Sequence, residues 1–313
     1  MNRFSCLLAL AVFLSLTAQP VLAKGNEAYP NGAEDIFSGM VPPPGFYVLD
    51  YNFYYTADEF EDAPGGLNDD DFDIDVYANV LRLLYVSPKQ FLGANWGAHI
   101  FIPYMFLNAE FDPPGIDFLD RDTCDLGDII VDPFILAWHW EHFHCVAGLD
   151  MYLPTGEYDR NEAFNIGRNN FTFEPVFAWT YVWESGWEVS QKIMLDFSTS
   201  NNDVIAPHPV TGVPTEGTLD PGAELHFDYA VDYGITPTIR AGVAGYAYWQ
   251  LEDNEIHGQD EAGPKSRVFA AGPVVSASFL DRRLTVSAKV LPEFGAQSHP
   301  EGVSTWLKVV YAF

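Results

Sequence analysis

Hydrophobic and polar residues alternate with a period of two along most of this chain. Between positions 187 and 198, apolar residues such as Val189 and Leu195 alternate with polar ones such as Glu188 and Lys192. Positions 223–233 repeat the pattern. A period of two places successive side chains on opposite faces of a β-strand. The pattern therefore predicts strands that have one apolar and one polar face.

Twelve such strands can be read from the sequence. Most are about 11 residues long, the length that a tilted strand needs to cross a bilayer. Their number is even, as in bacterial single-chain barrels. They cover 45–55, 75–86, 94–106, 128–138, 142–154, 171–181, 186–198, 223–233, 238–251, 266–279, 283–294 and 302–313.

The connections between these strands alternate in length. Long acidic loops such as 56–74 and 199–222 follow the odd strands, and short turns such as 139–141 and 234–237 follow the even ones. A soluble β-sandwich, the alternative all-β fold, has no reason to sort its loops in this way. We therefore predict an all-β fold, an antiparallel up-and-down transmembrane β-barrel of about twelve strands.

The last strand carries the same signature to the end of the chain. Its face containing Leu307 ends on the aromatic Phe313, whereas Lys308 lies on the opposite face. In a barrel the outer face meets lipid and the inner face meets water. We expect this strand to close the barrel with Leu307 toward lipid.

The N-terminus indicates export. Arg3, a short apolar run and small residues ending at Ala23 are typical of a cleavable signal peptide. We therefore divide the chain into a signal peptide (1–23), an N-terminal segment (24–44) that would act as a plug if it folds into the lumen, and the barrel (45–313). The expected location is the bacterial outer membrane.

Composition supports a membrane barrel. Aromatic residues make up 15% of the chain, and Trp residues cluster at two of the short turns, near Trp140 and Trp183. Aromatic girdles of this kind mark membrane interfaces, although core aromatics of a soluble domain are the alternative. The net charge of −29 argues against nucleic acid as a partner.

The charges fall into two groups. Acidic residues of the long loops offer oxygen atoms that suit Ca²⁺, but a hydrated acidic surface, or divalent bridges to lipopolysaccharide, explains them as well. These weak calcium candidates are Asp69, Asp70, Asp71 and Asp73. The charges on inward strand faces would either pair with one another or line a polar path. The lumen-lining candidates are Arg82, Asp132, Glu174, Glu188, Lys192, Asp228, Arg240 and Lys289.

Catalytic patterns were sought as well. No nucleophile elbow or Gly-rich phosphate loop occurs. His139, His142 and His144 are close in sequence, but on a turn entering a strand they do not share one face. We therefore predict no catalytic residues, no cofactor and no metal site, and hence not an enzyme.

Four stretches resemble the phenol meta-pathway degradation protein family of outer-membrane proteins. They are Val41-Pro-Pro-Pro-Gly-Phe-Tyr47; Gly127-Asp-Ile with Asp132-Pro133; Leu153-Pro-Thr-Gly-Glu-Tyr158 through Asn165-Ile-Gly-Arg-Asn169 to Phe173-Glu-Pro175; and Pro221-Gly-Ala-Glu-Leu-His226. The resemblance implies a barrel that passes hydrophobic or aromatic compounds and is linked to their catabolism. It supplies no functional residues.

Two functions remain open at this point. One is a transporter or channel for small hydrophobic or aromatic compounds; the other is a non-transporting structural or adhesive barrel with acidic external loops. The expected partners are the lipid bilayer, lipopolysaccharide, the outer-membrane barrel assembly machinery and a small hydrophobic solute.

Overall fold

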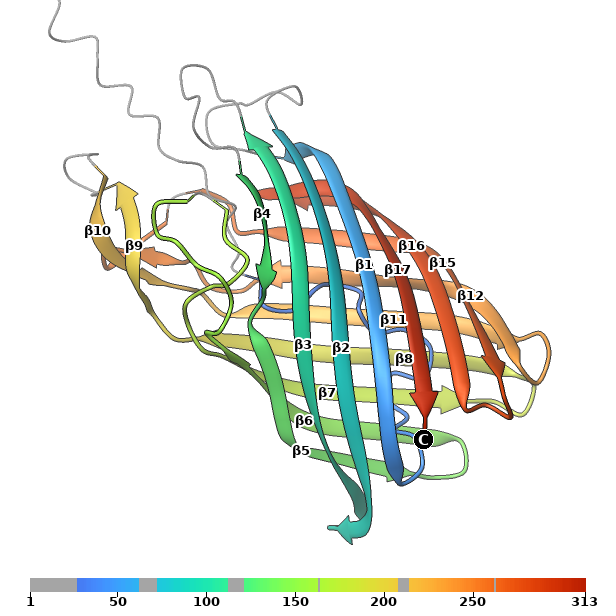
Figure 1. Ribbon diagram of the computed structural model, residues 1–313. Helices are drawn as coiled ribbons and strands as arrows, with labels where there is room; N and C mark the ends of the chain where they lie inside the picture. Colours follow the sequence, from blue (N-terminus) through green and yellow to red (C-terminus); the bar gives the residue numbers. More distant parts are fainter. Residues whose placement is uncertain (1–26, 62–71, 112–120, 163, 208–213, 262) are drawn as a thin grey trace, which may run out of the picture.

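The computed structural model describes residues 27–61, 72–111, 121–162, 164–207, 214–261 and 263–313. Twelve antiparallel strands in these ranges form a closed barrel (Figure 1). They are β1 (Gly45–Glu61), β2 (Phe72–Phe91), β3 (Ala94–Phe111), β5 (Ile129–His139), β6 (Phe143–Leu153), β7 (Thr172–Val182), β8 (Trp187–Ser198), β11 (Glu224–Gly234), β12 (Ile239–Gln250), β15 (Arg267–Phe279), β16 (Leu284–Gln297) and β17 (His299–Ala312). The predicted fold class is confirmed.

The barrel closes between its first and last strands. β1 pairs with β17 from Tyr47↔Ala312 to the far end of both strands, with Phe53 opposite Trp306. All other barrel neighbours are adjacent along the chain, as in an up-and-down barrel. Closure leaves no unpaired strand edge, which is a requirement for a sheet surrounded by lipid.

The long loops contain more structure than the sequence predicted. β1, β2 and β3 continue into 56–74 and 107–127, where Asp73 stands opposite Glu110. The remaining strands in the predicted loops are β4 (Arg121–Leu126), beside β3, and β9 (Asn201–Pro207), β10 (Pro214–Asp220), β13 (Glu255–Ile256) and β14 (Gln259–Asp260), which form a separate small sheet. The loop prediction was therefore wrong in these parts. It relied on apolar strand faces, but strands outside the bilayer can be polar on both faces because water solvates them.

The two faces of the strands separate as predicted. On β8, Glu188, Ser190 and Lys192 are buried inside the barrel, whereas Trp187 and Phe197 are exposed outside it. On β17, Lys308 is buried and Leu307 is 44% exposed. The predicted orientation of the closing strand is thus confirmed.

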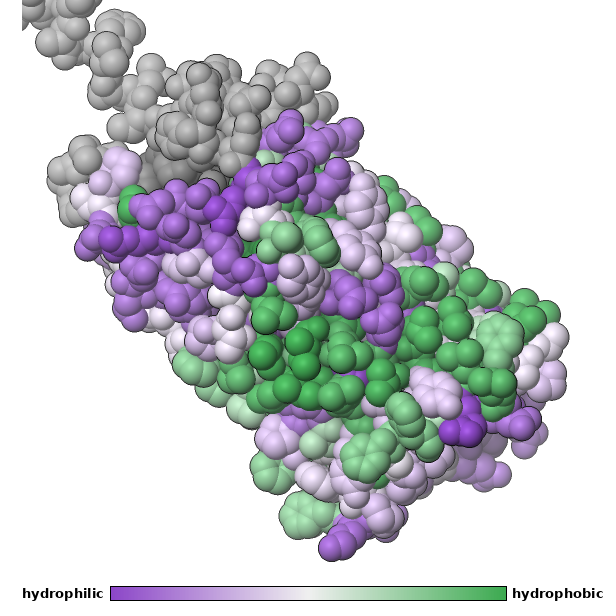
Figure 2. All heavy atoms as spheres, viewed as in Figure 1, coloured by the Kyte–Doolittle hydropathy of each residue, from purple (hydrophilic) through white to green (hydrophobic). Residues whose placement is uncertain are grey.

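The outer surface carries an apolar band. Figure 2 shows hydrophobic residues gathered across the middle of the barrel and polar residues toward the long-loop end. The exposed outward side chains in the strands include Leu83, Leu149, Phe177, Val243, Val275, Val290 and Leu307. At the short-turn end, Trp140, Trp183, Trp187 and Phe313 are exposed. A band with aromatic residues at its margin is the lipid-facing surface of an outer-membrane barrel, and the protein is located in that membrane.

Among the described residues, no helix combines the length and apolar character needed to cross a membrane.

Leu307→Asp should lower the amount of assembled barrel, because a charged side chain on the lipid face costs up to about 2–4 kcal/mol, with Asp toward the lower end. The measurement is the heat-modifiable band of outer-membrane fractions in semi-native gels. Leu280→Asp is the matched control. Leu280 is 63% exposed in a short turn and has a φ of 51°, which Asp tolerates well. Equal assembly of the two variants would contradict the assignment of Leu307 to lipid.

The loop lengths predict the orientation of the barrel in the membrane. The long loops should face the outside of the cell, and the short turns should face the periplasm. In a Cys124→Ser background, cysteines placed at Asp203 and Asp260 should react with an impermeant maleimide on intact cells. Cysteines at Gly234 and Asp281, in the short turns, should react only after lysis. Labelling of all four on intact cells, or the reverse pattern, would show that the predicted orientation is wrong.

Candidate functional site

The N-terminal segment lies inside the barrel. From residue 27 onward it descends from the long-loop end to the short-turn end, where β1 begins (Figure 1). Near the long-loop end, Glu27 Oε1 lies 2.8 Å from His299 Nε2. Near the short-turn end, the Gly39 amide donates to Thr180 Oγ1 over 3.0 Å. The segment therefore passes through the whole lumen.

Carboxylates of the barrel wall fix the backbone of the segment. Asp228 on β11 accepts hydrogen bonds from the amides of Gly32 and Glu34, at 2.9 and 3.0 Å, and from the Tyr29 hydroxyl. Further down, Glu188 on β8 accepts from the Phe37 amide at 2.9 Å. A segment without regular secondary structure needs such partners for its buried amides. The inward acids meet this need.

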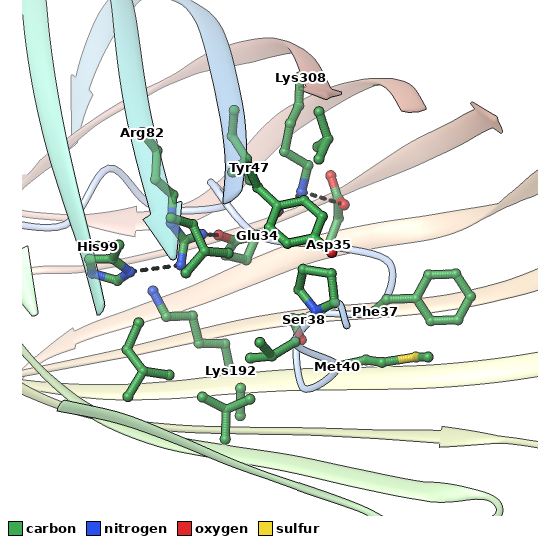
Figure 3. Close-up of a pocket in the computed structure, with 18 of the residues that line it drawn as sticks. Glu34, Asp35, Phe37, Ser38, Met40, Tyr47, Arg82, His99, Lys192 and Lys308 are labelled. Atoms are coloured by element: carbon green, nitrogen blue, oxygen red, sulfur yellow. Dashed lines mark hydrogen bonds and ion pairs between the residues drawn. The ribbon is translucent and has the colours of Figure 1, made fainter. Parts of the chain in front are cut away.

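Two acids of the segment meet the cations of the opposite wall (Figure 3). Glu34 binds Arg82 of β2 at 3.0 Å and Lys308 of β17 at 3.2 Å. Asp35 binds Lys308 at 2.9 Å and Lys289 of β16 at 2.8 Å. We call Glu34, Asp35 and these three cations the anchoring cluster. Because the acids lie between the cations, the charges offset one another inside the lumen.

The electrostatics of Glu34 reflect this arrangement. Its carboxylate is buried but lies close to both Arg82 and Lys308, and neighbouring positive charges favour the ionised form of a carboxyl group.

The segment also approaches the wall closely. A Cβ atom added to Gly39 would lie 2.3 Å from the backbone of Trp179. Only glycine fits at this contact, so Gly39 fixes how near the segment lies to β7.

All eight predicted lumen-lining residues face the inside of the barrel. Arg82, Glu188, Asp228 and Lys289 contact the N-terminal segment as described above. Lys192 Nζ lies 4.3 Å from the centre of the Tyr29 ring. Arg82 and Lys289 thus pair with acids of the N-terminal segment rather than with acids of neighbouring strands.

The other three candidates interact mainly with residues of the barrel wall. Arg240 binds Asp232 and stacks over Phe37 at 5.0 Å. Asp132 accepts from the amides of Phe134 and Leu149. Glu174 accepts from the Tyr152 hydroxyl at 3.1 Å.

Two cavities lie beside the segment. The long-loop cavity has a volume of about 500 Å³ and is lined by aromatic and aliphatic side chains that include Phe53, Met105, Ile130, Tyr246 and Trp306. The short-turn cavity has a volume of about 260 Å³ and is lined by residues that include Tyr47, Leu84, Ile135, Val146 and Val310 (Figure 3).

The cavities meet at one level of the barrel. Glu34, Phe101, Asp150 and Lys192 line both of them. Each cavity exceeds the roughly 150 Å³ that suffices to hold benzene in a protein interior.

Among the described residues, the other sequence candidates are not gathered into one site. His139 Nδ1 and His144 Nδ1 lie 3.0 Å apart, while His142 contacts Tyr181 instead. Of the calcium candidates, Asp69, Asp70 and Asp71 lie outside the described residues, as does the predicted signal peptide. Asp73 lies on β2 opposite Glu110.

Sequence reasoning missed the roles of Tyr29, Glu34 and Asp35. Each interacts with a residue about 200 or more positions away, such as Asp228 or Lys308. The available signal was indirect, since the inward cations of β2, β16 and β17 have no acid opposite them on these strands.

Comparison with known proteins assigns the chain to a family. The model of the family described as the MetA-pathway of phenol degradation matches residues 57–309. The chain belongs to this family. No similarity to a curated protein was found.

Solved structures share the fold. An outer membrane channel from Pseudomonas putida F1 is 17% identical, with 90% of this chain and 100% of that chain covered and a TM-score of 0.76. The transport unit of the Escherichia coli autotransporter AIDA-I is 9% identical, with 88% and 92% covered and a TM-score of 0.52. The Neisseria meningitidis NalP translocator domain is 8% identical, with 86% and 89% covered and a TM-score of 0.51. The family therefore shares its barrel architecture with outer-membrane channels.

Asp35→Asn should destabilise the folded protein by about 3–5 kcal/mol, because it leaves buried Lys289 and Lys308 with one carboxylate fewer. Urea unfolding in lipid vesicles, followed by Trp fluorescence, measures the change. The control is Asp203→Asn, which removes an exposed pair with Arg160 at 2.9 Å and should cost about 0–1 kcal/mol. If the urea midpoint of the Asp35→Asn variant equals that of the wild-type protein, the ion pairs of Asp35 do not anchor the segment.

Proposed function

We propose that this family member is an outer-membrane channel for small hydrophobic or aromatic compounds and serves their catabolism. The observation that carries the proposal is the pair of adjoining cavities beside the N-terminal segment, of which the larger, long-loop cavity is lined mainly by apolar side chains. Ligand sites of about 300–1,000 Å³ with mostly apolar walls suit small apolar molecules. The family description, which concerns phenol degradation, agrees with such a solute.

The N-terminal segment determines the kind of passage. It occupies the axis of the barrel and is held by buried hydrogen bonds and ion pairs, so it acts as a plug. Bulk flow of water and ions is blocked, and the route is restricted to the cavities at its side. This favours slow, facilitated passage of single small molecules over open diffusion.

The charges of the lumen fit an uncharged solute. The cations of the anchoring cluster are paired with Glu34 and Asp35, and the cavity walls between the charges are apolar. An ionic solute would have to shed its water without new partners of opposite charge, which is costly. An apolar solute loses nothing of this kind and gains contact with the aromatic walls.

The proposal also includes the partners that surround the barrel. The bilayer contacts the apolar band. The acidic long loops meet lipopolysaccharide, and the barrel assembly machinery inserts the chain. Lipopolysaccharide slows apolar solutes, so a dedicated route benefits a cell that feeds on them.

A substitution that narrows the long-loop cavity tests transport. Ala78 is 5% exposed and lines this cavity, so Ala78→Trp should fill part of it and slow the uptake of radiolabelled toluene at least several-fold. Tyr77 is the next residue and faces outward at 38% exposure, so Tyr77→Trp is the matched control and should leave uptake unchanged. Both variants are compared at equal levels of heat-modifiable barrel.

A deletion strain decides between the two functions. If it takes up toluene as fast as its parent, the channel proposal fails and the structural or adhesive barrel is favoured.

In planar bilayers the wild-type protein should show low conductance, and removal of residues 27–40 should raise it, because the segment no longer fills the lumen. Equal conductance of both proteins would contradict the role of the segment as a plug.

A further inference from the structure

Three acids and one histidine meet on the inner wall near the long-loop end. Glu224 on β11 stands opposite Asp196 on β8. Glu174 on β7 lies beside Asp196, between the pairs Phe173↔Phe197 and Val176↔Met194. His226 follows Glu224 on the same face of β11. All four side chains are at most 2% exposed.

The N-terminal segment fixes the tautomer of His226. The Asn31 amide group donates from Nδ2 to Glu27 Oε2 at 2.7 Å, so its oxygen is the atom that faces the histidine. His226 Nδ1 lies 2.7 Å from this oxygen and donates to it. In a neutral imidazole with hydrogen on Nδ1, Nε2 carries a lone pair.

Carboxylate oxygens lie near that lone pair. His226 Nε2 lies 3.4 Å from Asp196 Oδ2 and 3.8 Å from Glu224 Oε2. His226 Nε2, both oxygens of Asp196 and Oε1 of Glu174 are buried and receive no hydrogen bond from any group in the described ranges. Acceptor atoms that face one another without a donor repel, and a cation between them would remove this repulsion.

We propose that His226, Asp196 and Glu224, with Glu174 beside them, bind a divalent transition-metal ion such as Zn²⁺. One ligand atom each from His226, Asp196 and Glu224 lies within 4.8 Å of the others. Around a tetrahedral ion with ligands at about 2.0–2.2 Å, neighbouring ligands are roughly 3.3–3.6 Å apart, close to the two distances from Nε2. A mixed imidazole and carboxylate set favours such ions over Ca²⁺ or Mg²⁺.

The outer contacts also match a metal site. A histidine that binds a metal through one nitrogen commonly donates its other N–H to a carbonyl or carboxylate oxygen, as His226 does to Asn31. The carboxylates are oriented in the same way. Tyr248 donates to Glu224 Oε1 at 3.0 Å, and Tyr152 donates to Glu174 Oε2.

A second cluster in the lumen, His99 with Asp132 and Asp150, shows the contrast. Arg82 donates to His99 Nδ1 at 2.8 Å, so Nε2 carries the hydrogen and donates to Asp150 at 2.7 Å. Asp132 accepts from two backbone amides. This cluster is satisfied by protein groups alone and provides an internal control.

The test measures metal binding by the folded full-length mature protein in detergent, in a Cys124→Ser background that removes an exposed thiol. After treatment with EDTA, calorimetry with Zn²⁺ and metal analysis should show one equivalent bound. His226→Gln should weaken binding at least about 100-fold, and Asn31→Ala about 10–100-fold. His99→Gln is the matched control and should bind Zn²⁺ like the parent.

Several outcomes would overturn the proposal. They are the absence of stoichiometric Zn²⁺ in the parent, equal binding by the His226→Gln and His99→Gln variants, and loss of binding in His99→Gln alone. If His226→Gln does not fold, X-ray absorption of the Zn²⁺-loaded parent decides. One imidazole and two or three oxygen ligands support the site, and a sulfur-rich or purely aqueous shell refutes it.

Discussion

The structure depends on the closure of the sheet. In lipid, every backbone N–H and C=O of the strands must be paired within the protein, and the pairing of β1 with β17 satisfies the last open edge. Closure also forces each strand to place alternate residues inside a confined lumen. The polar residues that alternate with the lipid-facing ones are thereby brought together, and they must find partners there.

The N-terminal segment provides many of these partners. The wall presents acids on β8 and β11, and cations on β2, β16 and β17. The segment offers backbone N–H groups to the acids and carboxylates to the cations, so one stretch of chain satisfies both sides. The cavities lie beside the segment, where apolar wall residues that need no partner alternate with the paired charges. The position of the segment and the two cavities beside it therefore follow from the same distribution of charge.

The fold could be predicted from the sequence because alternation and loop length are local signals. The inward position of residues such as Lys192 and Asp228 follows from the same period of two. The interior arrangement could not be predicted in this way. Glu34 and Asp35 lie in an irregular segment without periodicity, and their partners are distant in sequence. The group around His226 draws on three strands, and only the exact register between them brings its atoms together. The absence of a local metal-binding motif therefore said little about a metal site.

The anchoring cluster has a consequence for how the barrel holds its shape. Its cations belong to β2, β16 and β17, and Tyr51 of β1 donates to Glu34, so the four strands on either side of the closing seam are joined through two adjacent residues. All of these contacts can be made at the same time only when the seam is shut. They add to the free energy that separates the closed barrel from one opened between β1 and β17. Thermal opening at this seam is therefore suppressed by a segment that is not itself part of the sheet.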